Sequence, residues 1–208
     1  ADPKVEYVAG GATQNSIRVA QWMCGVPGST SYTSCVGKDK NGELLGKCMA
    51  DAGVNAFYMV DETTPTGTCA VVVVEKERSL VANLAAANNY KISHTDKPES
   101  WAIVEKSNIV YSAGFFLTVS TDSMVKVAES CAASGATYCM NLSAPFLMEV
   151  PPLKGAMMSV MPNVDILFGN ETEAATFAKT EGWTETSIAD IAVKLAALPK
   201  NKGARMVV

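Results

Sequence analysis

The sequence predicts an α/β protein in which strands and helices alternate along the second half of the chain. Hydrophobic residues make up 48% of the 208 residues and charged residues 18%, which is enough apolar material for a sizeable core. Short β-prone runs lie at residues 108–113, 137–141, 164–168 and 204–208. Segments with apolar residues at helical spacing separate these runs. This alternation is typical of βαβ units, so we expect a parallel sheet covered by helices on both faces.

The expected helices of this half span residues 123–132, 171–180 and 187–198, and residues 157–161 are expected to belong to a further helix. Residues 91–99 and 199–203 are predicted loops, and neither is long enough for a domain boundary. We therefore expect residues 1–208 to belong to one α/β domain.

The middle of the chain predicts a β-hairpin. Residues 68–74 form one candidate strand, the charged group at 75–78 a turn, and residues 79–84 a returning strand. In such a strand Leu80, Ala82 and Leu84 share one face, because successive side chains alternate. The hairpin is either a flap that turns this apolar face inward over a site or an ordinary edge hairpin.

A Gly-Gly pair precedes a polar, helix-opening run, Gly10-Gly11-Ala12-Thr13-Gln14-Asn15-Ser16. Two glycines let the backbone turn sharply and approach a bound molecule closely. The unpaired N–H groups of a helix N-terminus can then bind a polar ligand. The alternative is a loop that only starts an amphipathic helix over residues 16–23.

Composition argues against several classes of protein. The formal net charge of −4 disfavours nucleic acid or an anionic membrane as partner, and the longest apolar runs are too short to span a membrane. The six cysteines contain no C-x-x-C pair, so we expect buried reduced thiols in a cytoplasmic protein. The single histidine, His94, lies in a polar stretch and is expected in a surface loop. Zinc sites and Ser-His-Asp machinery therefore have little support.

Candidate site residues follow three predicted strands: the segments 114–117, 141–146 and 168–173. In open parallel sheets, ligands bind beyond the carboxyl ends of the strands. Asn170 and Glu173 have the spacing of a capping box, which is the common structural explanation for such a pair. Phe115 is equally typical of a core residue, and Arg78 of a solvated turn. The chain has neither G-x-x-x-x-G-K-[ST] nor G-x-G-x-x-G, so a P-loop and a Rossmann fingerprint are absent.

Six segments together resemble the adenosine-phosphorylating members of the ribokinase-like family of carbohydrate kinases. They occur in the family's order at residues 10–16, 65–69, 78–88, 113–120, 141–146 and 168–175. The resemblance implies a ribokinase-like α/β core with a small β lid, inserted here as segments of about 5–9, 29–37 and 56–88. It also implies Mg²⁺-dependent transfer of the γ-phosphate of ATP to the 5′-hydroxyl of adenosine, by a cytoplasmic monomer for which a nuclear pool is allowed.

The resemblance also assigns roles to individual residues. The substrate-binding set is Gly10, Gly11, Ala12, Asn15, Cys69, Leu80, Ala82, Leu84 and Phe115. Within it, Phe115 would stack on the adenine and the lid residues would form an apolar wall against it. Arg78 would be the catalytic residue that neutralises charge on the transferring phosphates. Asn141, Asn170 and Glu173 would serve the nucleotide, with Glu173 supporting Mg²⁺ through water.

The sequence also departs from the family's pattern. The catalytic aspartate of the family lies in a Gly-Ala-Gly-Asp segment, which residues 1–208 do not contain. The strand expected well before Gly10 is also missing, so we expect a chain truncated at both ends and inactive by itself. Two alternatives stay open: another nucleoside or sugar kinase of the family, and a non-catalytic nucleoside-binding fragment.

Overall fold

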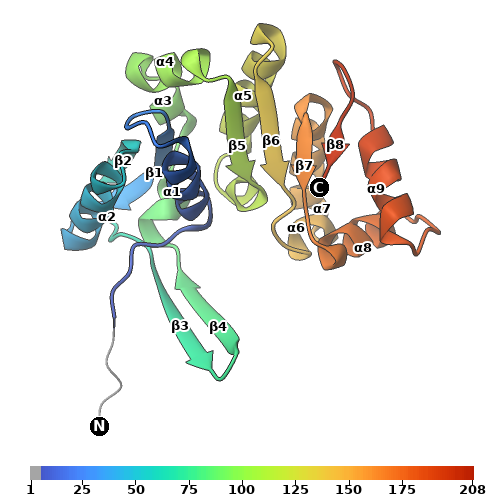
Figure 1. Ribbon diagram of the computed structural model, residues 1–208. Coiled ribbons are helices and arrows are strands. Elements are labelled where there is room, and N and C mark those ends of the chain that lie inside the picture. The colour runs from blue at the N-terminus through green and yellow to red at the C-terminus, as the bar shows by residue number, and fades with distance from the viewer. Residues whose placement is uncertain (1–5) are drawn as a thin grey trace. The chain divides into compact units, whose positions relative to one another are not determined.

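The computed structural model describes residues 6–208, which divide after Tyr90 into two units (Figure 1). The elements of the first unit are α1 (Ala12–Cys24), β1 (Ser31–Gly37), α2 (Lys40–Asp51), β2 (Asn55–Asp61), β3 (Thr68–Val74), β4 (Glu77–Asn83) and the 3₁₀ helix η1 (Ala85–Asn89). Those of the second are α3 (Ile92–Thr95), α4 (Pro98–Lys106), β5 (Ile109–Ala113), η2 (Gly114–Thr118), α5 (Thr121–Ser134), β6 (Thr137–Asn141), α6 (Phe146–Glu149), α7 (Pro151–Val160), η3 (Met161–Asn163), β7 (Ile166–Phe168), α8 (Glu171–Thr180), α9 (Ile188–Ala197) and β8 (Met206–Val207).

The first unit is built on a short parallel sheet. β1 pairs with β2 from Ser31↔Asn55 to Gly37↔Asp61, and α2 makes the crossover between them. α2 begins at a capped N-terminus, because the carboxylate of Asp39 accepts a hydrogen bond from the backbone N–H of Gly42 at 2.8 Å.

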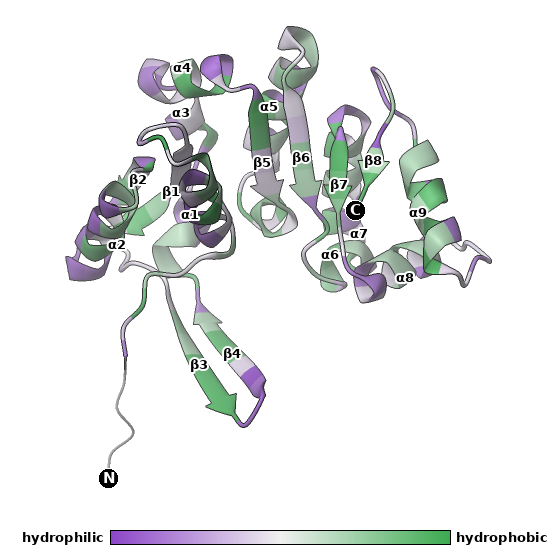
Figure 2. Cartoon of the chain, viewed as in Figure 1, coloured by the Kyte–Doolittle hydropathy of each residue, from purple (hydrophilic) through white to green (hydrophobic). Residues whose placement is uncertain are grey.

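The predicted hairpin is present as the antiparallel pair β3–β4, in register from Thr68↔Asn83 to Val74↔Glu77. Its loop is shorter than expected, because β4 already begins at Glu77 and only Glu75 and Lys76 remain between the strands. Glu75 takes a left-handed conformation with φ 56° that closes this tight connection. Every residue of both strands is exposed, although β3 is largely hydrophobic (Figure 2).

The second unit contains a four-stranded, all-parallel sheet in the order β5-β6-β7-β8. These strands confirm the four β-prone runs of the second half, with β7 and β8 shorter than expected. The helix at 171–180 is confirmed at both ends as α8. Residues 157–160 belong to a helix as expected: α7 begins at Pro151, because a proline in the first turn suits a helix start, and Met161 begins the 3₁₀ helix η3.

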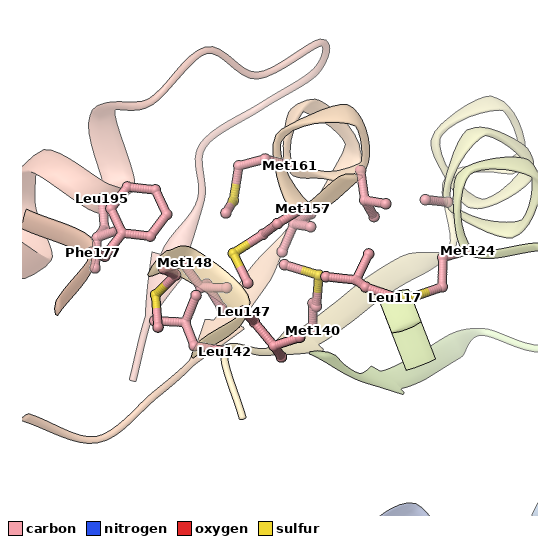
Figure 3. Close-up of a cluster of buried hydrophobic side chains, with 14 of the residues drawn as sticks. Leu117, Met124, Met140, Leu142, Leu147, Met148, Met157, Met161, Phe177 and Leu195 are labelled. Atoms are coloured by element: carbon pink, nitrogen blue, oxygen red, sulfur yellow. The ribbon is translucent and has the colours of Figure 1, made fainter. Parts of the chain in front are cut away.

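The core of the second unit lies on one face of its sheet (Figure 3). β6 contributes Tyr138 and Met140, and α5, α7, α8 and α9 supply the side chains that pack over them. On the opposite face, Ile109 and Met206 are 67% and 60% exposed. Cys139, which lies on that opposite face in the central part of the sheet, is 5% exposed. The predicted parallel sheet with flanking helices is confirmed, and the main core cluster lies on the face that bears Tyr138 and Met140.

Two predictions for residues 91–99 are wrong. This segment contains α3 and the start of α4 rather than a loop, because Pro98 occupies the first turn of a helix, where its missing N–H costs nothing. His94 lies in α3 and is 6% exposed, so it is a buried residue and not a surface one. The division into two units lies just before this segment, after Tyr90, and the expectation of one α/β domain over residues 1–208 stays a prediction.

The prediction of buried cysteines holds for half of them. Cys35, Cys131 and Cys139 are buried, and burial raises the pKa of the Cys131 thiol to about 11. Cys24 and Cys69 are exposed, because Cys69 lies on an uncovered hairpin and Cys24 ends α1. All six are free thiols.

The segments predicted as a lid fall into different structures. Residues 31–37 and 55–61 form the parallel pair β1–β2, whereas 68–83 form the separate hairpin. Of residues 5–9, Val5 lies outside the described residues and 6–9 belong to no helix or strand. The lid assignment therefore stays a prediction. Among the described residues, no helix has the length and apolar character needed to cross a membrane.

Candidate active site

The Gly-Gly pair opens a helix as predicted. Gly11 is the N-cap of α1 with φ 115°, a backbone conformation that residues with a side chain rarely adopt. Its carbonyl accepts a hydrogen bond from the N–H of Asn15 at 2.8 Å. Among residues 6–208, no side-chain hydrogen bond caps this end of α1. Gly10, Gly11, Ala12 and Asn15 are all exposed. These four predicted substrate-binding residues thus lie together at an accessible helix N-terminus.

The hairpin gathers four predicted site residues on one face. Residues directly opposite each other in an antiparallel pair share a face, and Cys69 pairs with Ala82, Val71 with Leu80, and Val73 with Arg78. Arg78 therefore lies on the same face as the apolar residues predicted to contact the base.

Two details of the predicted wall need correction. Leu84 follows the last residue of β4 and has the helical angles φ −73° and ψ −29°, so strand alternation does not extend to it. The flap alternative turns the apolar face inward, yet Leu80 and Leu84 are 58% and 50% exposed.

The root of β3 is fixed by a carboxylate that the sequence analysis missed. Asp39 accepts hydrogen bonds from the hydroxyl and the backbone N–H of Thr66, both at 2.7 Å, and the Thr66 hydroxyl accepts the N–H of Gly37 at 2.9 Å. These bonds from Thr66 lower the pKa of Asp39. Thr66 is 4% exposed, so α2, β1 and the entry to β3 are tied together in a buried network.

The exit from the hairpin is held by a second carboxylate. Asp61, at the end of β2, accepts the backbone N–H of Thr63 and the side-chain amide of Asn89 in η1, at 2.9 and 2.7 Å. These bonds hold the pKa of Asp61 well below its usual range. A side chain at Gly67 would lie 2.6 Å from the carbonyl oxygen of Leu84, so the two ends of the hairpin cross in close contact.

In the second unit, predicted residues lie at the carboxyl edge of the sheet. Ala113, Asn141 and Phe168 end neighbouring strands in register. The Asn141 side-chain oxygen accepts the N–H of Ser143 at 2.6 Å, and the Ser143 hydroxyl accepts the N–H of Gly114 at 2.8 Å. This network fixes the turns that follow β5 and β6.

Phe115 emerges from the turn after β5. It is 44% exposed, and its ring centroid lies 6.3 Å from that of Phe146. Phe115 is therefore not a core residue, whereas the nearby Leu117 is buried in the core. An exposed aromatic pair at this edge can stack against a flat apolar ligand.

Asn170 and Glu173 form the capping box that their spacing predicted. The Asn170 side-chain oxygen accepts the N–H of Glu173 at 2.8 Å, and the Glu173 carboxylate accepts the backbone and side-chain N–H groups of Asn170 at 3.1 and 3.0 Å. Glu173 is 6% exposed. Within residues 6–208, no group of three or more His, Cys, Asp or Glu side chains could itself hold a metal ion.

Comparison with known proteins identifies the family. Residues 1–208 match the pfkB family carbohydrate kinases. The chain is 54% identical to adenosine kinase 2 of Arabidopsis thaliana over 199 residues, which are 96% of this chain and 57% of that protein. It is 43% identical to adenosine kinase of Schizosaccharomyces pombe, over 100% of this chain and 61% of that protein.

Solved structures agree with this assignment. Adenosine kinase of Anopheles gambiae in complex with P1,P4-di(adenosine-5) tetraphosphate superposes with a TM-score of 0.92 at 43% identity, over 97% of this chain and 59% of that chain. Adenosine kinase of Schistosoma mansoni in complex with adenosine, in an occluded loop conformation, gives 0.92 at 32% identity over the same shares. The chain spans about 57–61% of the length of these relatives. With its ribokinase-like α/β fold, this chain belongs to the pfkB family of carbohydrate kinases.

Proposed function

We propose that this chain functions in an adenosine kinase, which transfers the γ-phosphate of ATP to the 5′-hydroxyl of adenosine. The observation that carries the proposal is the hairpin register, which sets Arg78 on the same face as Leu80 and Ala82. One face thus offers an apolar surface for a purine and, beside it, a guanidinium for phosphate oxygens. The similarity to adenosine kinases of several organisms supports the same substrate.

The second unit would supply the remaining contacts. Phe115, exposed at the carboxyl edge of the sheet, would stack on the adenine. In the first unit Gly10, Gly11 and Asn15 would bind the ribose hydroxyls, and Ala12 would belong to the same substrate-binding segment. Asn141 and Asn170 would contact the nucleotide.

Magnesium fits the proposed site as a hydrated ion. Mg²⁺ in kinases is usually bound through one or two carboxylates and the substrate phosphates, and it retains several waters. Each oxygen of Glu173 accepts one hydrogen bond from Asn170, and a carboxylate oxygen has two lone pairs. Acceptor positions therefore remain for the waters of the ion, which would neutralise phosphate charge when bound.

We propose separate roles for the guanidinium and for the apolar residues. Arg78 orients and stabilises the transferring phosphate, and the apolar face of β4 with Phe115 excludes water from the base. In the family, the aspartate of a Gly-Ala-Gly-Asp segment is the general base that deprotonates the 5′-hydroxyl. Residues 1–208 do not contain this segment. We therefore propose that these residues alone bind adenosine without turnover. The expected monomeric state and cytoplasmic location stay predictions.

The test is AMP formation by the protein expressed from its complete coding sequence, with adenosine, inosine and ribose as acceptors. Adenosine should be the preferred acceptor, and Arg78→Ala should lower kcat by about 100-fold or more. Lys76→Ala is the matched control, since Lys76 is a cation in the loop of the same hairpin. Preferred phosphorylation of ribose would instead support a sugar kinase. Adenosine binding without ATP consumption would support a non-catalytic binding protein.

A further inference from the structure

β3 is an unbroken valine run whose two faces the sequence does not distinguish. Val71, Val72, Val73 and Val74 follow one another, so alternation of polar and apolar residues is missing. The register distinguishes them: Val71 lies opposite Leu80, and Val73 opposite Arg78. Val72 and Val74 therefore lie on the other face of the hairpin.

Val71 and Val72 have nearly the same surroundings apart from the face they occupy. Their exposed fractions are 54% and 53%, so packing against the rest of the chain does not distinguish them. Both are valines in the middle of the same strand. A difference between their effects on a ligand would therefore report which face the ligand contacts.

We propose that Val71 is a specificity-determining residue that contacts the purine base together with Leu80, which makes the apolar wall two strands wide. This inference rests on the proposed function. Directly opposite side chains in an antiparallel pair have Cβ atoms about 4.5–5.5 Å apart. A flat ring is wider than this spacing, so a base that touches Leu80 lies within reach of Val71.

The order along the face agrees with a nucleoside whose base lies nearer the hairpin root. From root to tip the opposite pairs are Cys69 with Ala82, Val71 with Leu80, and Val73 with Arg78. Arg78 lies two residues beyond Leu80, a rise of about 7 Å along the strand. The face thus offers an apolar surface first and a cation one step farther, which matches a base followed by a phosphate-accepting hydroxyl.

The experiment compares Val71→Thr with Val72→Thr in the protein expressed from its complete coding sequence. Threonine keeps the β-branched shape and strand preference of valine and replaces one methyl by a hydroxyl. Both positions are exposed, so both variants should unfold at the wild-type temperature. Adenosine affinity is measured by calorimetry, and KM and kcat by AMP formation.

Val71→Thr should weaken adenosine binding by about 5- to 30-fold, because an unpaired hydroxyl would be buried against the base. It should raise KM for adenosine and leave kcat and KM for ATP unchanged, as expected for loss of uniform binding. Val72→Thr should match the wild type. Equal effects of the two variants, or a larger effect of Val72→Thr, would overturn the inference. A folded wild-type protein that binds no adenosine would overturn the proposed function itself, and this inference with it.

Discussion

Glu173→Gln separates the capping role of Glu173 from a role in phosphate transfer. Both carboxylate oxygens accept hydrogen bonds from Asn170, at 3.1 and 3.0 Å. A glutamine offers one oxygen instead of two, so one Asn170 donor loses its acceptor. The first turn of α8 also loses a negative charge.

The expected loss of stability is small. A lost cap contact costs about 1 kcal/mol, and removal of a charge that favours the helix N-terminus a further ~0.3–1 kcal/mol. The free energy of unfolding should therefore fall by about 1–2 kcal/mol, which lowers the midpoint of thermal unfolding by about 2–8 °C for a chain of this size. Circular dichroism measures this midpoint directly.

The matched control is Glu171→Gln, which removes the same charge from the same helical turn without touching the capping box. If Glu173 orients waters of a bound Mg²⁺, Glu173→Gln should reduce kcat by about 10- to 100-fold, while Glu171→Gln leaves it near the wild-type value. Equal activity of the two variants at a temperature where both are folded would refute this reasoning. Glu173 would then be a structural cap only.

Three further outcomes are expected. Arg205 is 5% exposed and donates hydrogen bonds to five backbone carbonyls. Arg205→Met should therefore lower the free energy of unfolding, measured by urea titration, by about 3–5 kcal/mol. A loss below about 1 kcal/mol would contradict this. Adenosine should slow alkylation of the exposed thiol of Cys69 but not that of Cys24, as peptide mass spectrometry would show, and equal protection would argue against a ligand on the hairpin face. Hydrogen bonds lower the pKa of Asp61 in the folded state. The contribution of Asp61 to stability is therefore complete above about pH 4 and is lost as the pH falls through the folded-state pKa. Acid should then destabilise Asp61→Asn less than it destabilises the wild type.

The strands of the second unit could be predicted because their signals are local. An apolar run bounded by polar residues or glycine marks each of β5 to β8, and the capping box at 170–173 marks the start of α8. Each signal spans a few neighbouring residues. The direction of the chain through such βαβ units then fixes where the strand ends meet, so the edge bearing Phe115 and Asn141 was foreseeable.

α1 shows where local periodicity fails. The sequence predicts an amphipathic helix with an apolar buried face, yet Gln14 and Gln21 are its buried residues, while Trp22 and Met23 are 78% and 75% exposed. Gln21 is buried because its amide donates to the carbonyl of Val26 and accepts from both polar groups of Thr30. Burial here follows hydrogen bonds to a later loop, which helical spacing does not report.

The hairpin root was missed for a related reason. Asp39 and Thr66 are 27 residues apart, and Asp61 and Asn89 are 28 apart. Each residue has an ordinary local reading: Asp39 as a helix cap, Asp61 as the end of a strand. Only the pairing of β1 with β2 brings both carboxylates beside the two ends of the hairpin.

The hydrogen bonds of Asp39 and Asp61 anchor only the two ends of the hairpin. Both of its ends are fixed by hydrogen-bonded carboxylates, whereas every residue of β3 and β4 is exposed. A two-stranded hairpin is only marginally stable in water without packing on at least one face. Burial of the Leu80 and Val71 face against a nucleoside would supply that packing. Substrate binding and ordering of the hairpin would then depend on the same apolar contacts, so a substitution on this face should weaken both together, whereas one on the Val72 face should weaken neither.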